Sequence, residues 1–375
     1  MTADRLLEIL NNNGIDFFCG VPDSLLKPFC DAVYLKYGGD PTHHLITHNE
    51  GGAVGYAAGY YLATGKVPCA YLQNSGLGNI TNPVASLTSP LVYGIPILYI
   101  AGWRGQPGIA DEPQHAFQGI VTEVQLETLD IAVFKLTEMA TEDELIQVMC
   151  NFKNLFAEGK SAALLVSKGA LSDGISKNYS SNWTLSREAA IARIAEMAQD
   201  AIIVSSTGKI SRELFETRNR LNLKHDRDFL TVGSMGHDSM IALSIAQQQP
   251  HRQVWSIQGD GAFLMHMGAA AMIGSVAPLN LRHIVLNNAA HESVGGMPTA
   301  GAAVDFCGVA KSCGYKQTFR IETINELDSA ILKMLAVNEL CFLEIRCAIG
   351  SRQNLGRPTA SPLENKEALI RALKV

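Results

Sequence analysis

The stretch VWSIQGDGAF, residues 254–263, decides the fold class of the second half of the chain. Its apolar run, 254–258, leads directly into Gly259-Asp260-Gly261, the pattern of a buried strand that ends in a tight turn. The segment 262–276 has helical spacing of small and apolar residues, and the apolar run 281–286 again has strand character. This order predicts a strand, helix, strand crossover in a parallel α/β sheet.

Polar residues follow both predicted strands at their carboxyl ends. Asp260 closes the first strand, and Asn287-Asn288 closes the second. Ligands of parallel α/β sheets bind outside the carboxyl ends of the strands, so these side chains are expected at one edge. Mg²⁺ prefers oxygen donors and shares them with phosphates, so a carboxylate, an amide oxygen and a backbone carbonyl would suit it. The sequence therefore predicts a magnesium site that holds a diphosphate.

Gly259-Asp260-Gly261 and Asn287-Asn288 together resemble the thiamine diphosphate fingerprint of the decarboxylase and acetolactate synthase superfamily. The resemblance implies thiamine diphosphate and Mg²⁺ as cofactors, with Asp260, Asn288 and the backbone carbonyl of Ala290 as metal ligands. Many relatives have glycine where Ala290 stands, but alanine supplies the same carbonyl unless the position needs a positive φ. The implied cofactor contacts come from the first motif, from a loop that bends the cofactor and from a strand-to-helix turn: Gly259, Asp260, Gly261 and Ala262; Gly233, Ser234 and Met235; Thr207, Gly208 and Ser211.

The N-terminal half resembles the pyrimidine-binding domain of the same superfamily. Residues 47–53, THNEGGA, are similar to the segment that carries the activating glutamate, and this assigns that catalytic role to Glu50. Residues 111–115, DEPQH, are similar to an active-site loop, which implies that His115 handles protons because an imidazole can do so near neutral pH. Many decarboxylases have two adjacent histidines there, whereas this chain has Gln114 before His115.

Two similar doubly wound parallel-sheet domains of thiamine diphosphate-binding type are predicted, without a central domain. Each half contains a capping box before an apolar helix and strand, Thr141 with Glu144 and Thr323 with Glu326. A polar, Ser- and Asn-rich stretch divides the halves, and Ser186 offers a helix N-cap after it. The expected domains are 1–172, which binds the pyrimidine, and 186–375, which binds the diphosphate, with 173–185 as the linker.

Within the superfamily, the segments 288–296 and 350–358 look like those of two-domain phosphonopyruvate decarboxylases. This resemblance covers nearly the whole chain and implies decarboxylation of 3-phosphonopyruvate to 2-phosphonoacetaldehyde and CO2, a step of phosphonate biosynthesis. In the superfamily the cofactor lies between two subunits, so at least a homodimer is implied.

The expected substrate is a 2-oxo acid with a second anionic group. Relatives that act on pyruvate have aspartate where Ser24 stands, and a hydroxyl would not repel a phosphonate as a carboxylate would. Asp23, directly before it, is an objection unless its carboxylate points away. Guanidinium forks match phosphonate oxygens, which makes Arg352 and Arg357 the first candidates for binding the substrate. His291, Arg104 and Lys27 are weaker candidates.

Three alternatives share parts of this pattern. A sulfopyruvate decarboxylase has the same two-domain plan and chemistry, and only the anionic group of its substrate differs. A carboligase resembling acetolactate synthase would usually carry a central domain. A non-catalytic thiamine diphosphate-binding regulator is disfavoured because Glu50, Asp260 and Asn288 are all present.

The composition excludes several partners. A formal charge of −6 and a pI near 5.9 give no basic surface for nucleic acid or an anionic membrane. The N-terminus lacks the charged start and apolar core of a signal peptide, and no apolar run reaches the length of a membrane span. These features predict a cytoplasmic protein.

Overall fold

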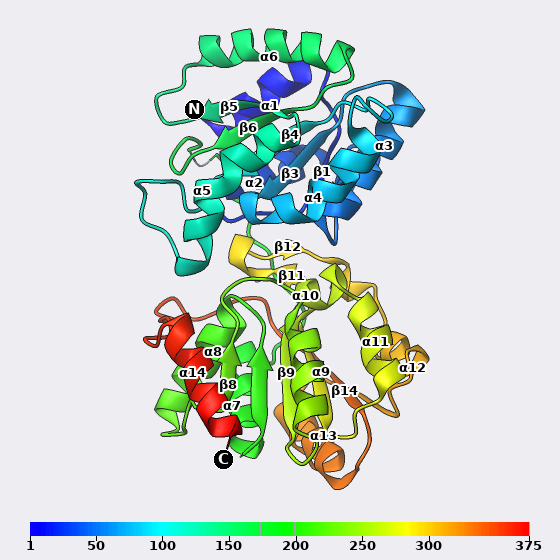
Figure 1. Ribbon diagram of the computed structural model, residues 1–375, viewed down its shortest axis with the longest axis vertical. Helices are drawn as coiled ribbons and strands as arrows, with labels where there is room; N and C mark the ends of the chain where they lie inside the picture. The colour runs from blue at the N-terminus through cyan, green and yellow to red at the C-terminus, as the bar shows by residue number, and fades with distance from the viewer. Residues whose placement is uncertain (173, 199, 375) are drawn as a thin grey trace. The chain divides into compact units, whose positions relative to one another are not determined.

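The computed structural model describes residues 1–172, 174–198 and 200–374, which form two compact units, Met1–Asn178 and Tyr179–Val375. The boundary between the units falls inside the stretch expected as a linker, 173–185, whose first residue lies outside the described part, as does residue 375. Each unit contains a six-stranded parallel sheet with helices packed on it (Figure 1). The predicted α/β class with two doubly wound parallel sheets is confirmed.

The first unit has the strand order β2-β1-β3-β4-β6-β5, with every pair parallel. Its strands are β1 (Phe18–Gly20), β2 (His44–Ile46), β3 (Cys69–Gln73), β4 (Leu98–Gly102), β5 (Ala132–Leu136) and β6 (Ala162–Val166). Its helices are α1 (Ala3–Asn12), α2 (Lys27–Tyr37), α3 (Glu50–Thr64), α4 (Leu77–Pro83), α5 (Pro113–Thr128) and α6 (Glu142–Ala157).

Two layers of helices enclose the first sheet. Apolar residues of α3, α4 and α5 form one core with the alternating residues of β3 that include Ala70 and Leu72. On the opposite face Tyr71 and Phe18 meet Phe29 of α2 in edge-on ring contacts. Burial on both faces explains why these strands are almost uniformly apolar.

The second unit has the order β13-β14-β10-β9-β7-β8, again with parallel pairs. Its sheet strands are β7 (Ile202–Ser205), β8 (Asp228–Leu230), β9 (Val254–Gly259), β10 (Leu281–Asn287), β13 (Gln317–Ile321) and β14 (Cys341–Arg346), and a separate two-stranded ribbon pairs β11 (Ala290–His291) with β12 (Met297–Pro298). Its helices are α7 (Arg187–Met197), α8 (Lys209–Arg220), α9 (Asp238–Gln248), α10 (Asp260–Met265), α11 (Gly268–Val276), α12 (Phe306–Ser312), α13 (Ile324–Ala336) and α14 (Pro362–Leu373).

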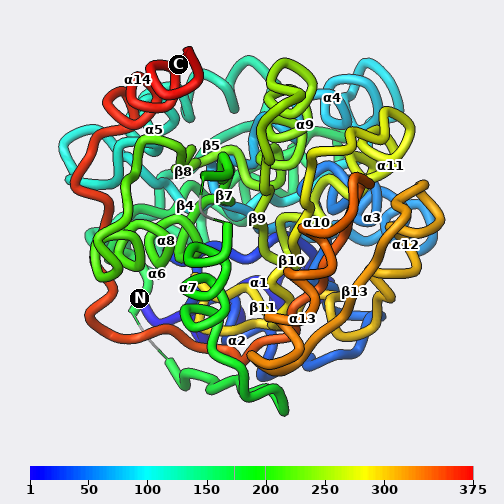
Figure 2. The backbone as a smooth tube through the Cα atoms, turned by 90° about the horizontal axis from the view of Figure 1, so that it is seen from below, coloured from blue at the N-terminus to red at the C-terminus, as the bar shows by residue number. Residues whose placement is uncertain are grey.

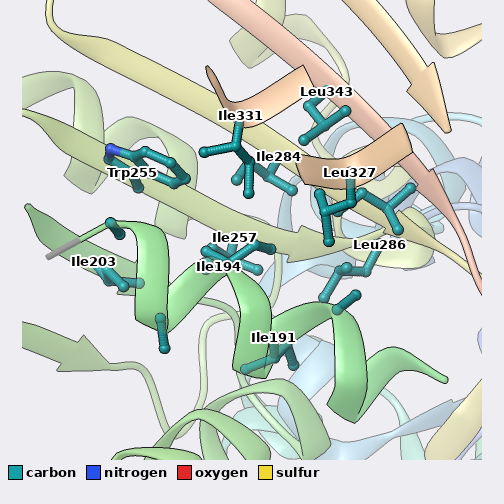
Figure 3. Packing of buried hydrophobic residues seen from close by; sticks show 14 of the residues in the cluster. Ile191, Ile194, Ile203, Trp255, Ile257, Ile284, Leu286, Leu327, Ile331 and Leu343 are labelled. Atoms are coloured by element: carbon teal, nitrogen blue, oxygen red, sulfur yellow. The ribbon is translucent and has the colours of Figure 1, made fainter. Parts of the chain in front are cut away.

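Helices α7, α8 and α13 cover one face of this sheet. Figure 3 shows Ile191 and Ile194 of α7 and Leu327 and Ile331 of α13 packed against strand residues such as Ile257. Residues of α9 to α12 and of α14 form the core on the other face, where α11 lies beside α12 (Figures 1 and 2).

Most local predictions agree with the structure. The strands expected at 254–258 and 281–286 are β9 and β10, and both predicted capping boxes are formed, at Thr141 and Thr323. The prediction of a single helix over 262–276 is wrong. The helix is interrupted at His266, because the φ of −132° and ψ of 45° of this residue are not helical. The result is two shorter helices, α10 and α11, so that Asp260 begins a helix of its own.

Candidate active site

In the first unit, four strands end at the edge where polar side chains collect. Strands β1, β2, β3 and β4 are parallel, so the segments that follow them carry Ser24, Glu50, Asn74 and Arg104 to one edge of the sheet. This is the edge where ligands of open α/β sheets bind.

Glu50 is the first residue of α3 and is buried, with 6% of its surface exposed. Asn49 caps this helix, because its side-chain oxygen accepts hydrogen bonds from Gly51 N–H at 2.8 Å and Gly52 N–H at 3.3 Å. The Glu50 carboxylate accepts a hydrogen bond from Asn79 Nδ2 at 2.7 Å. A Cβ placed on Gly76 would lie 2.6 Å from Glu50 Cγ, so the absence of a side chain there makes room for the carboxyl group.

Asn79 and Gly76 were not recognised as site residues from the sequence. Both lie in the glycine-containing stretch 74–79, NSGLGN, directly after β3. Their position after a buried strand was a usable signal, because polar residues at that point reach the ligand edge of the sheet.

The side chains of Ser24 and Asp23 lie in different surroundings. Asp23 is 1% exposed, and its carboxylate accepts hydrogen bonds from Gln73 Nε2 at 2.5 Å and Leu25 N–H at 3.1 Å. Burial raises the pKa of the Asp23 carboxyl group. Ser24 is exposed, and its hydroxyl accepts a hydrogen bond from Arg104 Nη1 at 2.9 Å. The Asp23 carboxylate is therefore directed into the unit, although its charge still acts on Arg104 and raises the pKa of that guanidinium.

His115 lies in the first turn of α5 and is buried. Desolvation and, second, the positive charge of Arg104 lower the pKa of its imidazole to about 4. His115 is therefore neutral at physiological pH.

In the second unit, oxygen atoms converge at the carboxyl ends of β9 and β10. Asp260 is 1% exposed, and its carboxylate accepts hydrogen bonds from the Thr299 hydroxyl and from backbone N–H groups that include that of Asn288. Burial raises the pKa of Asp260 to about 6. A Cβ placed on Gly301 would lie 2.7 Å from Asp260 Oδ2 and 2.7 Å from Asn287 Oδ1.

The amide of Asn288 is held in one orientation. Its Nδ2 donates to Glu292 Oε2 at 2.8 Å, and its Oδ1 accepts from Ala290 N–H at 3.1 Å. Glu292 also pairs with Lys209 Nζ at 3.2 Å and with Arg187 Nη1 at 3.3 Å. The sequence did not predict Thr299, Gly301 or Glu292 as site residues, because their contacts with the motif are formed by the folding back of 290–302.

Ala290 lies in β11, where it is paired with Pro298. Proline has no N–H, so this partner donates no hydrogen bond to the Ala290 carbonyl. The residue with positive φ is Ala289, at 55°, and not Ala290. Asp260 accepts a hydrogen bond from the Asn288 N–H, and Asn288 Oδ1 accepts one from the Ala290 N–H, so the three groups expected for Mg²⁺ lie on adjoining segments. Carboxylate, amide and carbonyl oxygens are ligands that fit this ion.

The loop 233–236 packs against the start of α10. Met235 Cε would lie 3.6 Å from a Cβ on Gly261, and His291 ring atoms would lie 3.7 Å from it. Ser234 has a φ of 53°, in the left-handed region. Among the residues that the structure describes, the imidazole of His291 has no hydrogen-bond partner, and burial lowers its pKa to about 4.

The turn after β7 brings Thr207 and Gly208 to the start of α8. Gly208 has a φ of 87°, a conformation that favours glycine, and the Thr207 hydroxyl donates to the Val232 carbonyl at 2.7 Å. Ser211 is buried, and its hydroxyl donates to the Ser206 carbonyl at 2.7 Å. Ser211 therefore ties the turn to the sheet from within the unit.

The two arginines of the C-terminal tail, Arg352 and Arg357, lie in the second unit. Arg352 pairs with Glu188, with Nε 3.0 Å from each carboxylate oxygen, and also with Glu216. Its charge is thus balanced by two carboxylates of its own unit. Arg357 is exposed and follows Leu355 and Gly356, whose carbonyls accept hydrogen bonds from Arg212.

Comparison with known proteins agrees with this geometry in both units. Residues 1–126 match the family described as thiamine pyrophosphate enzyme, N-terminal TPP binding domain, and residues 208–345 match the corresponding C-terminal TPP binding domain. The chain is therefore a thiamine diphosphate-dependent enzyme of the 2-oxo acid decarboxylase class. Within the described residues, no helix is long and apolar enough to cross a membrane.

Relatives that match nearly the whole chain identify the family within this class of enzymes. The chain is 36% identical to a phosphonopyruvate decarboxylase of Streptomyces viridochromogenes, over 96% of this chain and 92% of that protein. It is 34% identical to one of Streptomyces hygroscopicus, over 97% and 92%, and 27% identical to a sulfopyruvate decarboxylase of Methanosarcina acetivorans, over 91% and 90%. The chain belongs to the phosphonopyruvate decarboxylase family.

Proposed function

We propose that this enzyme decarboxylates 3-phosphonopyruvate to 2-phosphonoacetaldehyde and CO2, with thiamine diphosphate and Mg²⁺ as cofactors. The observation that carries the proposal is the identity of 36% to a phosphonopyruvate decarboxylase over 96% of this chain and 92% of that protein, combined with a buried Glu50 and a buried Asp260 at the ligand edges of their sheets. A sulfopyruvate decarboxylase is the second candidate, because a relative of that name matches nearly the whole chain.

Asp260, Asn288 and the Ala290 carbonyl would hold Mg²⁺, which would bind the diphosphate group. The oxygen atoms around Gly301 support this assignment, since a hard cation prefers such donors. Gly259, Gly261 and Ala262 would lie beside the diphosphate, together with Thr207 and Gly208 at the start of α8.

Met235 and the loop that contains Gly233 and Ser234 would support the bent form of the cofactor. When bound, thiamine diphosphate supplies an electron sink for the bond that breaks as CO2 leaves. The residues of the chain orient the reactants, exclude water and move protons around this step.

Glu50 would hold a proton at the pyrimidine ring. It is buried and fixed by Asn79 at 2.7 Å, so it would present its carboxyl group in one direction. His115 would move protons at the substrate. Its pKa is lowered partly by Arg104, so an anionic substrate beside Arg104 would raise that pKa and make the imidazole a better proton carrier.

At least a homodimer is part of the proposal. Helix α5 exposes an apolar stripe at helical spacing, in which Phe117 is 74% exposed and Ile120 and Val124 are each 63% exposed. Exposed apolar groups at this spacing are typical of a helix that packs against another chain. A second copy would cover the stripe.

The test is a substrate panel with the purified enzyme, thiamine diphosphate and Mg²⁺. CO2 release is measured from phosphonopyruvate, sulfopyruvate and pyruvate. The proposal predicts the highest kcat/KM for phosphonopyruvate. A higher value for sulfopyruvate would establish the second candidate instead, and an acyloin product would indicate a carboligase.

A further inference from the structure

Arg104 is the cation that lies against Ser24. It follows β4 and donates a hydrogen bond from Nη1 to the Ser24 hydroxyl at 2.9 Å, across a sequence separation of 80 residues. Ser24 is the position where a hydroxyl, unlike the aspartate of relatives that act on pyruvate, would not repel the second anionic group of the substrate. Arg352, the first candidate from the sequence, is instead held between Glu188 and Glu216 in the other unit.

The guanidinium of Arg104 is fixed by Asp111. Its Nε donates to Asp111 Oδ2 at 2.8 Å, and its Nη2 donates to Oδ1 at 2.5 Å. Asp111 is fixed in turn, because its carboxylate accepts hydrogen bonds from the N–H groups of Gly105 and Glu112, each at 2.8 Å. A bidentate pair of this kind sets the plane of the fork.

The backbone of Arg104 is fixed as well. Asn74 Nδ2 donates to the Arg104 carbonyl at 2.8 Å, and Asn74 Oδ1 accepts from the Arg104 N–H at 3.2 Å. Asn74 is fully buried and also donates to the Thr122 hydroxyl at 2.8 Å. The side chain therefore starts from a rigid point at the ligand edge of the sheet.

Two donors of the fork remain for an anion. A guanidinium has five N–H groups, of which two point to Asp111 and one to Ser24 in this geometry. The other two lie on Nη1 and Nη2, and the side chain keeps 20% of its surface exposed. Asp111 balances the positive charge of Arg104. The site would therefore bind an anion mainly through the directed N–H donors of a preorganised guanidinium, and less through net charge.

We propose that Arg104, positioned by Asp111 and joined to Ser24, binds the phosphonate group of the substrate. This inference rests on the proposed function. It replaces Arg352 and Arg357 as the substrate-binding arginines and names Asp111 as a positioning residue. The site lies entirely in the first unit, on the same sheet edge as Glu50 and beside His115.

The test compares Arg104→Gln, Arg104→Lys and the matched control Arg352→Gln, each loaded with thiamine diphosphate and Mg²⁺. KM and kcat are measured for phosphonopyruvate, and binding of phosphonoacetate, an unreactive phosphonate, is measured by calorimetry. Charge-assisted hydrogen bonds of this kind predict that Arg104→Gln raises KM and weakens phosphonoacetate binding about 30-fold. Arg104→Lys should recover part of the loss, and Arg352→Gln should stay within about twofold of wild type.

Two outcomes would overturn the inference separately from the function. If wild type turns over phosphonopyruvate and Arg104→Gln keeps its KM and its phosphonoacetate affinity, Arg104 does not bind the phosphonate. The same holds if Arg352→Gln shows the larger loss. If wild type turns over none of the oxo acids, the proposed function fails, and the calorimetry still reports whether Arg104 binds a phosphonate. Circular dichroism of each variant separates a lost contact from a lost fold.

Discussion

At the residue scale, the position of Glu50 depends on a glycine that faces it. Gly76 has φ −77° and ψ −6°, so alanine would fit its backbone without strain. The constraint is steric, because an added Cβ would lie 2.6–2.7 Å from the Glu50 side chain. The two residues are 26 positions apart, and only the folded strand ends bring them together.

Gly76→Ala should therefore displace the Glu50 carboxyl group and lower kcat on the order of 100-fold, because misplacement by about 1 Å has effects of that size. Gly78→Ala is the matched control, since a Cβ at Gly78 would have no atom within 4 Å. Steady-state kinetics and thermal unfolding of both variants check this. Equal kcat values for the two variants would show that Glu50 is not constrained by Gly76.

The sequence predicts the place of a single residue in the fold where a motif lies at a strand end. Asp260, Asn288 and Glu50 all lie at such positions in the structure. It did not predict which residues the arginines contact, because a contact between residues far apart in the sequence leaves no local pattern. The ion pair of Arg352 with Glu188 spans 164 positions, and the hydrogen bond of Arg104 with Ser24 spans 80.

At the element scale, the segment after β10 folds back over the predicted metal site. The ribbon of β11 and β12 returns the chain so that Thr299 and Gly301 meet Asp260 and Asn287. A strand signal of two residues is too short to detect from sequence periodicity. Long strands and capped helices were predictable from the sequence. The ribbon of β11 and β12 and the interruption of the helix at His266 were not.

Gly301→Ala should weaken Mg²⁺ binding about 10- to 100-fold, because the added methyl group would displace the oxygens of Asp260 and Asn287. The control is Gly268→Ala, where a Cβ would meet no atom within 4 Å. The measurement is the Mg²⁺ concentration that gives half of the thermal stabilisation in the presence of thiamine diphosphate. An unchanged midpoint in Gly301→Ala would contradict this placement of the metal.

At the scale of the whole molecule, the two units repeat one plan. Each has a six-stranded parallel sheet, and each brings its polar residues to the carboxyl ends of the strands. The repetition was visible in the sequence, through the two capping boxes and the apolar strands that follow them. The homodimer stays a prediction from the resemblance, because an apolar stripe on a helix does not identify its partner.

If the α5 stripe lies in the interface of the proposed homodimer, Ile120→Glu should shift the enzyme from dimer to monomer, since the introduced charge would have to be buried without a partner. Met139→Glu is the control, because Met139 is 85% exposed and lies outside the stripe. Analytical ultracentrifugation gives the mass, and decarboxylase activity should fall with the dimer. A dimer of unchanged mass in Ile120→Glu would place the interface elsewhere.

A single experiment shows whether Glu50 drives a thiamine diphosphate-dependent decarboxylation of phosphonopyruvate. Phosphorus NMR follows the conversion of phosphonopyruvate to phosphonoacetaldehyde by wild type and by Glu50→Gln, both with thiamine diphosphate and Mg²⁺. Wild type should convert phosphonopyruvate, and Glu50→Gln should do so at a rate at least about 100-fold lower. Conversion at equal rates, or no conversion by wild type, would contradict this expectation.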